Sequence, residues 1–236
     1  MKRIVTLVCV VMSVMALQAK DYLGFQIGFA QSVTRLNAPV LEKKTELNPT
    51  MYNGMKIGLL YDGTIIKGFG VTMGVNYTFG VSATDWTSKN PTISQYPKVR
   101  SRGQYHQIEI PVEWQYKFEI AQRTWLILYT GPTIQCGLSF SDKWYYDDGV
   151  QDPHITHKEN LYSKEDMNDF ALKRLNVTWG VGAGFQYERY FLRGGYDFGM
   201  INPYKAQKFD NVDISTRGRF DQWQVKIGMY FWESKK

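Results

Sequence analysis

Apolar and non-apolar residues alternate one by one along most of the chain after residue 22. The clearest segment runs from Gly68 to Ser82, where every second residue is apolar and the residues between are Gly, Thr, Asn or Ser. Successive side chains of a β-strand point to opposite faces. A period of two therefore predicts a strand with one apolar face and one small, polar face.

The same alternation predicts eight strands. They are expected at residues 23–30, 52–61, 68–82, 104–118, 124–140, 175–187, 191–200 and 222–231. The uncharged stretch 124–141 has a rival interpretation as a transmembrane helix. Gly131 and Pro132 lie in its middle, and proline in a helix interior costs about 3 kcal/mol, so the strand is favoured.

Long and short connections alternate between these strands. The expected connections are residues 37–51, 62–67, 83–103, 119–123, 141–173, 188–190 and 201–217. Bacterial outer-membrane barrels have long external loops, short periplasmic turns and an even strand count that returns both termini to the periplasm. The pattern predicts an all-β fold, an eight-stranded antiparallel up-and-down transmembrane barrel with periplasmic termini.

The chain begins with the features of an export signal. Lys2 and Arg3 precede an apolar run from Ile4 to Leu17, and Ala19 offers a small residue at the cleavage point. The run is shorter than the roughly 20 residues that a membrane-spanning helix needs. We expect a signal peptide at residues 1–19 and one outer-membrane barrel domain at residues 20–236.

Composition after cleavage narrows the function classes. Loss of Lys2 and Arg3 reduces the formal net charge from +6 to +4, and the basic residues do not gather into runs, so nucleic acid is not an expected partner. Cys136 would be the only cysteine left, so an intramolecular disulfide is excluded.

The two strand faces indicate which one meets lipid. A soluble ligand-binding barrel would turn its apolar face inward around a cavity. The other face here is rich in glycine, which suits the narrow interior of an eight-stranded barrel better than a water-exposed surface. The apolar face is therefore predicted to face the lipid of a Gram-negative outer membrane.

The strand Tyr105-His-Gln-Ile-Glu-Ile-Pro-Val-Glu-Trp-Gln-Tyr-Lys-Phe118 and the Gly131-Pro132 step after it resemble the outer-membrane β-barrel domain family that includes the PorT-like small barrels. The resemblance covers most of residues 20–236. It implies a secretion-system accessory role and partners in the envelope. The chain departs from such barrels by adding residues 233–236 after the aromatic Phe231 and Trp232.

The polar faces carry eight charged residues into the predicted interior. They are Lys56, Lys117, Arg193, Lys226, Glu109, Glu113, Glu188 and Asp197. Four bases and four acids in a narrow lumen are tolerable if they pair, so we predict structural ion pairs across the barrel. The same groups lining water would instead form a conduction path.

Other chemistry has weaker support. His154 and His157 have an H-x-x-H spacing beside acidic residues, but no helix fixes that spacing and a solvated acidic loop explains the same residues. No metal, cofactor or catalytic residue is predicted. The leading hypothesis is a non-enzymatic barrel that acts through external loops or envelope partners. The alternatives are a narrow, porin-like channel and a lipid-modifying enzyme active at the rim.

Overall fold

The computed structural model describes residues 20–40, 43–46, 50–66, 68–83, 87–88, 98–147, 154–163, 171–204, 207–209, 212–214 and 217–234. The signal peptide expected at residues 1–19 lies outside them. Eight long strands form the main sheet: β1 (Lys20–Val40), β3 (Thr50–Ile66), β4 (Phe69–Ala83), β6 (Lys98–Ala121), β7 (Thr124–Asp147), β9 (Leu175–Tyr187), β10 (Tyr190–Gly199) and β13 (Arg217–Glu233). Five short strands accompany them: β2 (Lys43–Glu46), β5 (Thr87–Ser88), β8 (His154–Asn160), β11 (Gln207–Phe209) and β12 (Val212–Ile214).

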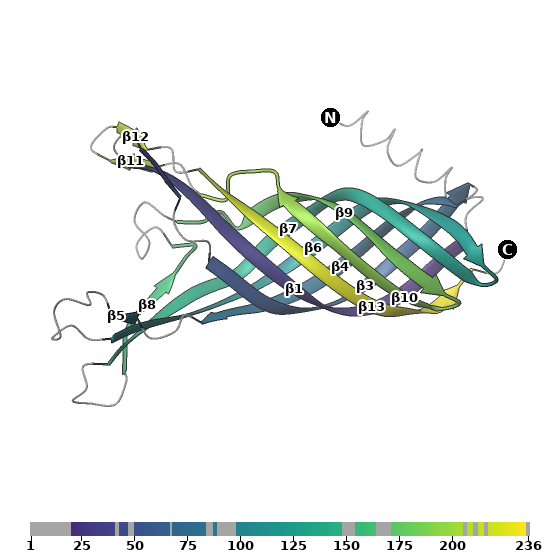
Figure 1. Cartoon of the computed structure of the whole chain (residues 1–236), viewed down its shortest axis with the longest axis horizontal. Coiled ribbons are helices and arrows are strands. Elements are labelled where there is room, and N and C mark those ends of the chain that lie inside the picture. The colour runs from purple at the N-terminus through teal and green to yellow at the C-terminus, as the bar shows by residue number, and fades with distance from the viewer. Residues whose placement is uncertain are drawn as a thin grey trace.

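The eight long strands close into a barrel (Figure 1). Each pairs antiparallel with the next long strand in the chain, and β1 pairs with β13 from Tyr22↔Glu233 to Asn37↔Arg217 to complete the ring. The order around the ring is β1, β3, β4, β6, β7, β9, β10, β13. The predicted eight-stranded antiparallel up-and-down barrel is confirmed.

Alternation along the strands places small and polar residues inside the barrel. On β4, Val75 is 55% exposed on the outer wall, whereas its neighbour Asn76 is 1% exposed in the lumen. Glycines on the inner face make room for larger neighbours. A Cβ atom added at Gly58 would overlap the Asn76 side-chain oxygen, and one added at Gly80 would overlap the Tyr105 ring. The glycine-rich face is therefore the crowded one.

Tight turns gather at one end of the barrel, which we call the short-turn end. They follow β3, β6 and β9, and residues with positive φ stand in each: Gly68 (89°), Arg123 (59°) and Glu188 (51°). β1 starts and β13 ends here, where the Ser234 amide donates to the Asp21 carbonyl at 2.9 Å. The first turn is tighter than predicted, because β3 continues to Ile66 and includes residues 62–66.

Strand extensions project from the opposite end, the long-loop end (Figure 1). β6 and β7 are 24 residues each, and β7 continues to Asp147, where β8 pairs with it. β7 also covers the uncharged stretch 124–141, so its predicted strand is confirmed. Within the described residues, no helix is long and apolar enough to cross a membrane.

Candidate functional site

The middle of the lumen holds a close ion pair. Lys56 of β3 and Glu109 of β6 approach to 2.5 Å between Nζ and Oε2, and both side chains are 1% exposed. Glu109 also accepts hydrogen bonds from Thr78 at 2.9 Å and Gln107 at 2.7 Å. Lys56 donates to Gln224 at 2.6 Å. Both charges are therefore surrounded by partners, as buried ions must be.

A second cluster is centred on Arg193 of β10. Its guanidinium lies 3.3 Å from Asp62 and 3.3 Å from Glu113, and it donates to Gln115 at 2.9 Å. Asp62 is also bound by Lys117 at 2.9 Å. β10 stands opposite β4 and close to opposite β3 and β6 in the ring, so the Arg193 side chain spans the lumen.

Two further contacts join the clusters into one network. Lys226 of β13 lies 3.8 Å from Glu113 of β6, on the opposite side of the ring. Asp197 accepts a hydrogen bond from Gln224 at 2.9 Å, and Gln224 is itself a partner of Lys56. The polar side chains of the lumen therefore bind one another across the barrel instead of lining an open passage.

Seven of the eight charged residues expected in the interior are buried there. They are Lys56, Glu109, Glu113, Lys117, Arg193, Asp197 and Lys226. Of these, Asp197 has no basic nitrogen within 4 Å among the described residues and relies on Gln224.

The predicted interior position of Glu188 is wrong. This residue stands in the tight turn after β9, where it pairs with Arg123 at 2.7 Å outside the lumen, and its side chain is 40% exposed. Two turn residues separate β9 from β10, so Glu188 no longer follows the strand alternation from which an interior position was predicted.

Asp62, and not Glu188, is the fourth acidic residue of the lumen. Its side chain is fully buried between Lys117 and Arg193, and it accepts hydrogen bonds from Gln115 and Tyr230. Asp62 lies in the connection that the sequence predicts at residues 62–67, but β3 continues through it and Asp62 points to the same face of β3 as Lys56. With Asp62 in place of Glu188, the lumen still contains four acids and four bases.

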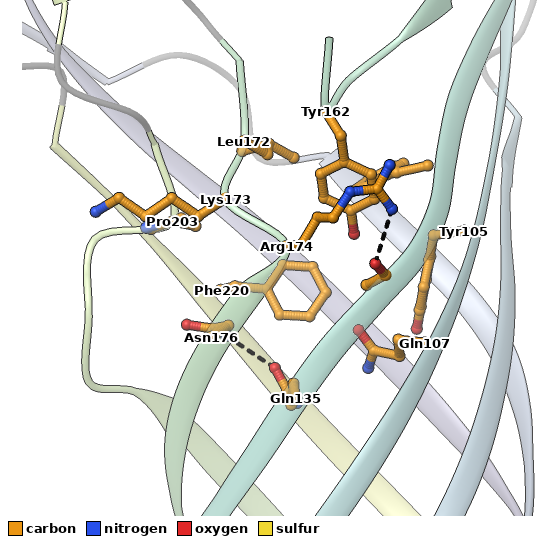
Figure 2. Close-up of a pocket in the computed structure, with 12 residues that line it drawn as sticks. Tyr105, Gln107, Gln135, Tyr162, Leu172, Lys173, Arg174, Asn176, Pro203 and Phe220 are labelled. Carbon is orange, nitrogen blue, oxygen red and sulfur yellow. Dashed lines mark hydrogen bonds between the residues drawn. The ribbon is translucent and has the colours of Figure 1, made fainter.

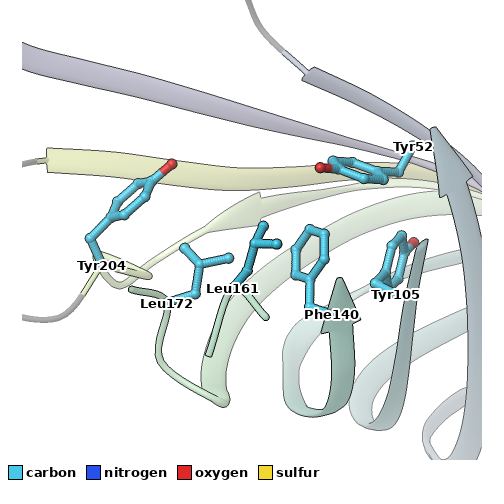
Figure 3. Close-up of a cluster of buried hydrophobic side chains, with 6 residues drawn as sticks. All are labelled: Tyr52, Tyr105, Phe140, Leu161, Leu172 and Tyr204. Atoms are coloured by element: carbon cyan, nitrogen blue, oxygen red, sulfur yellow. The ribbon is translucent and has the colours of Figure 1, made fainter. Parts of the chain in front are cut away.

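Above this network an aromatic and aliphatic cluster caps the long-loop end of the lumen (Figure 3). Its buried members are Tyr52, Tyr105, Phe140, Leu161, Leu172 and Tyr204. Leu161 and Leu172 belong to the described parts of the connection between β8 and β9. The Leu161 amide donates to the Phe140 carbonyl at 2.9 Å, and the Leu172 amide donates to the Leu161 carbonyl at 2.7 Å. We call this group the cap.

A small cavity of about 30 Å³ lies below the cap (Figure 2). Gln135 and Asn176 line it, and Asn176 Nδ2 donates to Gln135 Oε1 at 2.7 Å. Gln135 Nε2 and Asn176 Oδ1 are buried and have no hydrogen-bond partner among the described residues. Arg174 closes its upper side by donating to the Leu138 carbonyl at 2.7 Å and lying 4.8 Å from the Tyr162 ring. A cavity of this size and polarity suits one or two water molecules.

Asp142 carries an unusual charge environment at the edge of the cap, beyond the lumen. It stands on the β7 extension directly opposite Glu159 of β8. Burial, together with the neighbouring Glu159 carboxylate, raises the pKa of the Asp142 carboxyl from 3.8 to about 6. A protonated Asp142 therefore suits the folded cap better than an ionised one.

The short-turn end opens into a wider vestibule of about 560 Å³. Lys117, Gln186 and Trp125 are among the residues lining it. Lys117 is held there by Asp62 and by the Gln186 side-chain oxygen at 3.1 Å. The ion network thus stands between this vestibule and the cap.

No group of His, Cys, Asp and Glu suited to a metal ion occurs within the described residues. The side chains of His154 and His157 lie outside that set. Glu109 and Glu113 are each engaged by a base, and no substrate-sized cleft reaches them among the described residues. Both glutamates are therefore bound into the ion network of the lumen.

No family model and no curated protein matches the chain, so the PorT-like resemblance has no support from these comparisons. Among solved structures, the chain is similar to Ail, the attachment invasion locus protein of Yersinia pestis. The identity is 12%, the match covers 91% of this chain and 100% of that chain, and the TM-score is 0.38. It is also similar to Neisserial surface protein A, with 11% identity, 88% of this chain and 97% of that chain covered, and a TM-score of 0.38. For the outer membrane protein OprG from Pseudomonas aeruginosa the identity is 11%, the covered shares are 91% and 97%, and the TM-score is 0.42. Likeness at this level concerns the fold alone.

Proposed function

We propose that the protein is a non-enzymatic barrel of the Gram-negative outer membrane that is closed to ions and acts through its long-loop end. The observation that carries this proposal is an apolar belt on the outer wall. Every strand of the ring contributes an exposed large apolar side chain: Phe25, Leu59, Val75, Ile110, Leu128, Val181, Leu192 and Ile227.

Water does not suit such a surface. Soluble monomers rarely expose contiguous apolar patches beyond a few hundred Å². A closed barrel leaves no unpaired strand edge, which is the condition for β-structure to cross a bilayer. The short-turn end then lies in the periplasm together with both ends of the barrel domain, and the extensions of β6, β7 and β8 lie outside the cell.

The plugged lumen favours an anchoring and presenting role over transport. A channel needs a continuous aqueous path, whereas Arg193 and Lys226 bind carboxylates of strands across the ring. A rim enzyme needs an activated nucleophile, and His106 instead stacks on Phe79 on the outer wall and bonds to Tyr77 at 2.5 Å. The loops and strand extensions of the long-loop end are then the surface available for contacts with envelope partners. The PorT-like resemblance makes secretion-system proteins the first partners to test.

Cysteine labelling tests location and orientation together. Cys136 is exposed on the outer wall of β7, so a Cys136→Ser variant provides a background without cysteine in the mature chain. In that background, a membrane-impermeant maleimide should label Lys158→Cys on intact cells and should label Arg123→Cys only after the cells are broken. Cysteine at Arg123 reacting on intact cells would reverse the orientation, and recovery of the protein without detergent would refute the proposal.

A further inference from the structure

Two arginines face each other on the outer wall near the long-loop end. Arg35 of β1 and Arg219 of β13 are direct cross-strand partners, and their side chains are 59% and 47% exposed. Like charges directly opposite in an antiparallel pair are destabilising. Their placement therefore requires a compensating negative charge.

Asp221 supplies part of that compensation. It lies two residues along β13 from Arg219 and is fully buried although it belongs to the outer face. Its carboxylate receives Arg219 Nε at 2.9 Å and the Gly199 amide at 3.0 Å, and Arg35 Nε lies 3.7 Å away. Both arginines approach through Nε, and their terminal nitrogens make no hydrogen bond within the described part of the chain.

The arginine pair lies just above the apolar belt. Trp223 follows Arg219 by four residues on the same face of β13, nearer the short-turn end. Its ring packs on Phe29 at 5.3 Å and its indole N–H donates to Gln31 at 2.8 Å, as an aromatic side chain at a membrane interface does. Four residues of a tilted strand rise by about 10 Å. The neighbouring Met200 and Ile201 are 60% and 37% exposed, so apolar surface extends toward Asp221 on this side.

We propose that Arg35 and Arg219 bind the phosphate of an outer-leaflet lipid. Among the described residues, two positive charges face one carboxylate, which leaves one charge uncompensated at headgroup height. A guanidinium binds a phosphate through two parallel N–H donors, and Asp221 leaves those donors free on both side chains. The apolar belt directly below would hold the acyl chains, which favours a lipid over free phosphate. The inference rests on the proposed outer-membrane location.

Native mass spectrometry of the detergent-solubilised protein tests this site. The probes are phosphatidic acid, diacylglycerol with the same acyl chains, inorganic phosphate and soluble dextran sulfate. We expect phosphatidic acid to bind, diacylglycerol to bind at least tenfold more weakly, and millimolar inorganic phosphate to leave lipid binding unchanged. The variant Arg35→Gln/Arg219→Gln should lose at least tenfold in affinity for phosphatidic acid.

Matched variants separate the outcomes. Arg102→Gln removes an exposed arginine from the outer wall of β6 and should leave binding unchanged. Arg219→Lys keeps the charge but loses the two-donor fork, so it should weaken binding severalfold even if the double variant does not fold. Equal affinity of wild type and double variant, equal loss in Arg102→Gln, or binding of dextran sulfate in place of lipid would overturn the site. In each case heat-modifiable, detergent-dependent protein would leave the proposed location standing.

Discussion

The Lys56–Glu109 pair gives the sharpest test of the lumen network. A Lys56→Met variant keeps most of the side-chain volume but leaves the Glu109 carboxyl buried without its base. No second base lies within 4 Å of Glu109 in the described structure, and Thr78 and Gln107 supply only neutral hydrogen bonds. Breaking a buried ion pair in this way costs about 3–5 kcal/mol. The equilibrium constant for unfolding should therefore rise by about two to four orders of magnitude.

Equilibrium unfolding in urea measures this loss on barrels refolded into lipid vesicles, with tryptophan fluorescence and heat-modifiable gel migration as readouts. Glu109→Gln should cost less, about 1–3 kcal/mol, because Lys56 keeps Gln222 and Gln224 as acceptors. The double variant should be more stable than the sum of the two losses predicts, by about 1–3 kcal/mol.

An exposed ion pair provides the control. Arg123 and Glu188 approach to 2.7 Å on the short turns in water, so Arg123→Gln should leave the unfolding midpoint unchanged. A Lys56→Met barrel as stable as wild type would refute the reasoning. So would single losses that add in the double variant, because independent sites do not form a pair.

Two further predictions concern the outer wall and the cap. Val75→Arg places a charge on the apolar belt and should lower the free energy of unfolding in vesicles by about 2–4 kcal/mol. Gln104→Arg, on the outer face above the belt, should lower it by at most about 1 kcal/mol. Equal losses in the two variants would contradict the assignment of the belt. Asp142 has a folded pKa of about 6 against 3.8 when unfolded, so its contribution to cap stability is complete below pH 3.8 and is lost as the pH rises through 6. Proteolysis of the cap should be slower at pH 4.5 than at pH 7.5, and Asp142→Asn should remove that difference.

The strand count and the sidedness of each strand follow from sequence because a period of two is a local signal. On β4, Val75 and Asn76 alternate as expected, and the glycines mark the crowded interior. The turn positions were harder to predict. Residues 62–67 were expected to connect two strands, yet Asp62 and Gly63 lie within β3 and the turn contains Gly68. The prediction that Glu188 lies inside the barrel was wrong for a related reason, because a tight turn interrupts the alternation there.

The cap and the arginine pair were not predictable in the same way. Leu161 and Leu172 share a buried cluster with Tyr52, which is more than 100 residues away in the sequence, and no periodic pattern along the chain encodes that contact. Arg35 and Arg219 are far apart in sequence and become neighbours only through the closure of β1 on β13. A signal for them was present in hindsight, because charged residues on an otherwise apolar face mark the end of the lipid-facing belt.

Conductance of the purified wild-type protein in planar lipid bilayers tests the central claim most directly, since a barrel plugged by Lys56, Glu109, Arg193 and Glu113 has no continuous water path. Insertion of the protein is checked independently, by recovering protease-protected, heat-modifiable protein from the same membranes. We predict inserted protein with no steady current at either voltage polarity. Reproducible, ion-selective current steps from the inserted wild-type protein would contradict the account and make the barrel a channel.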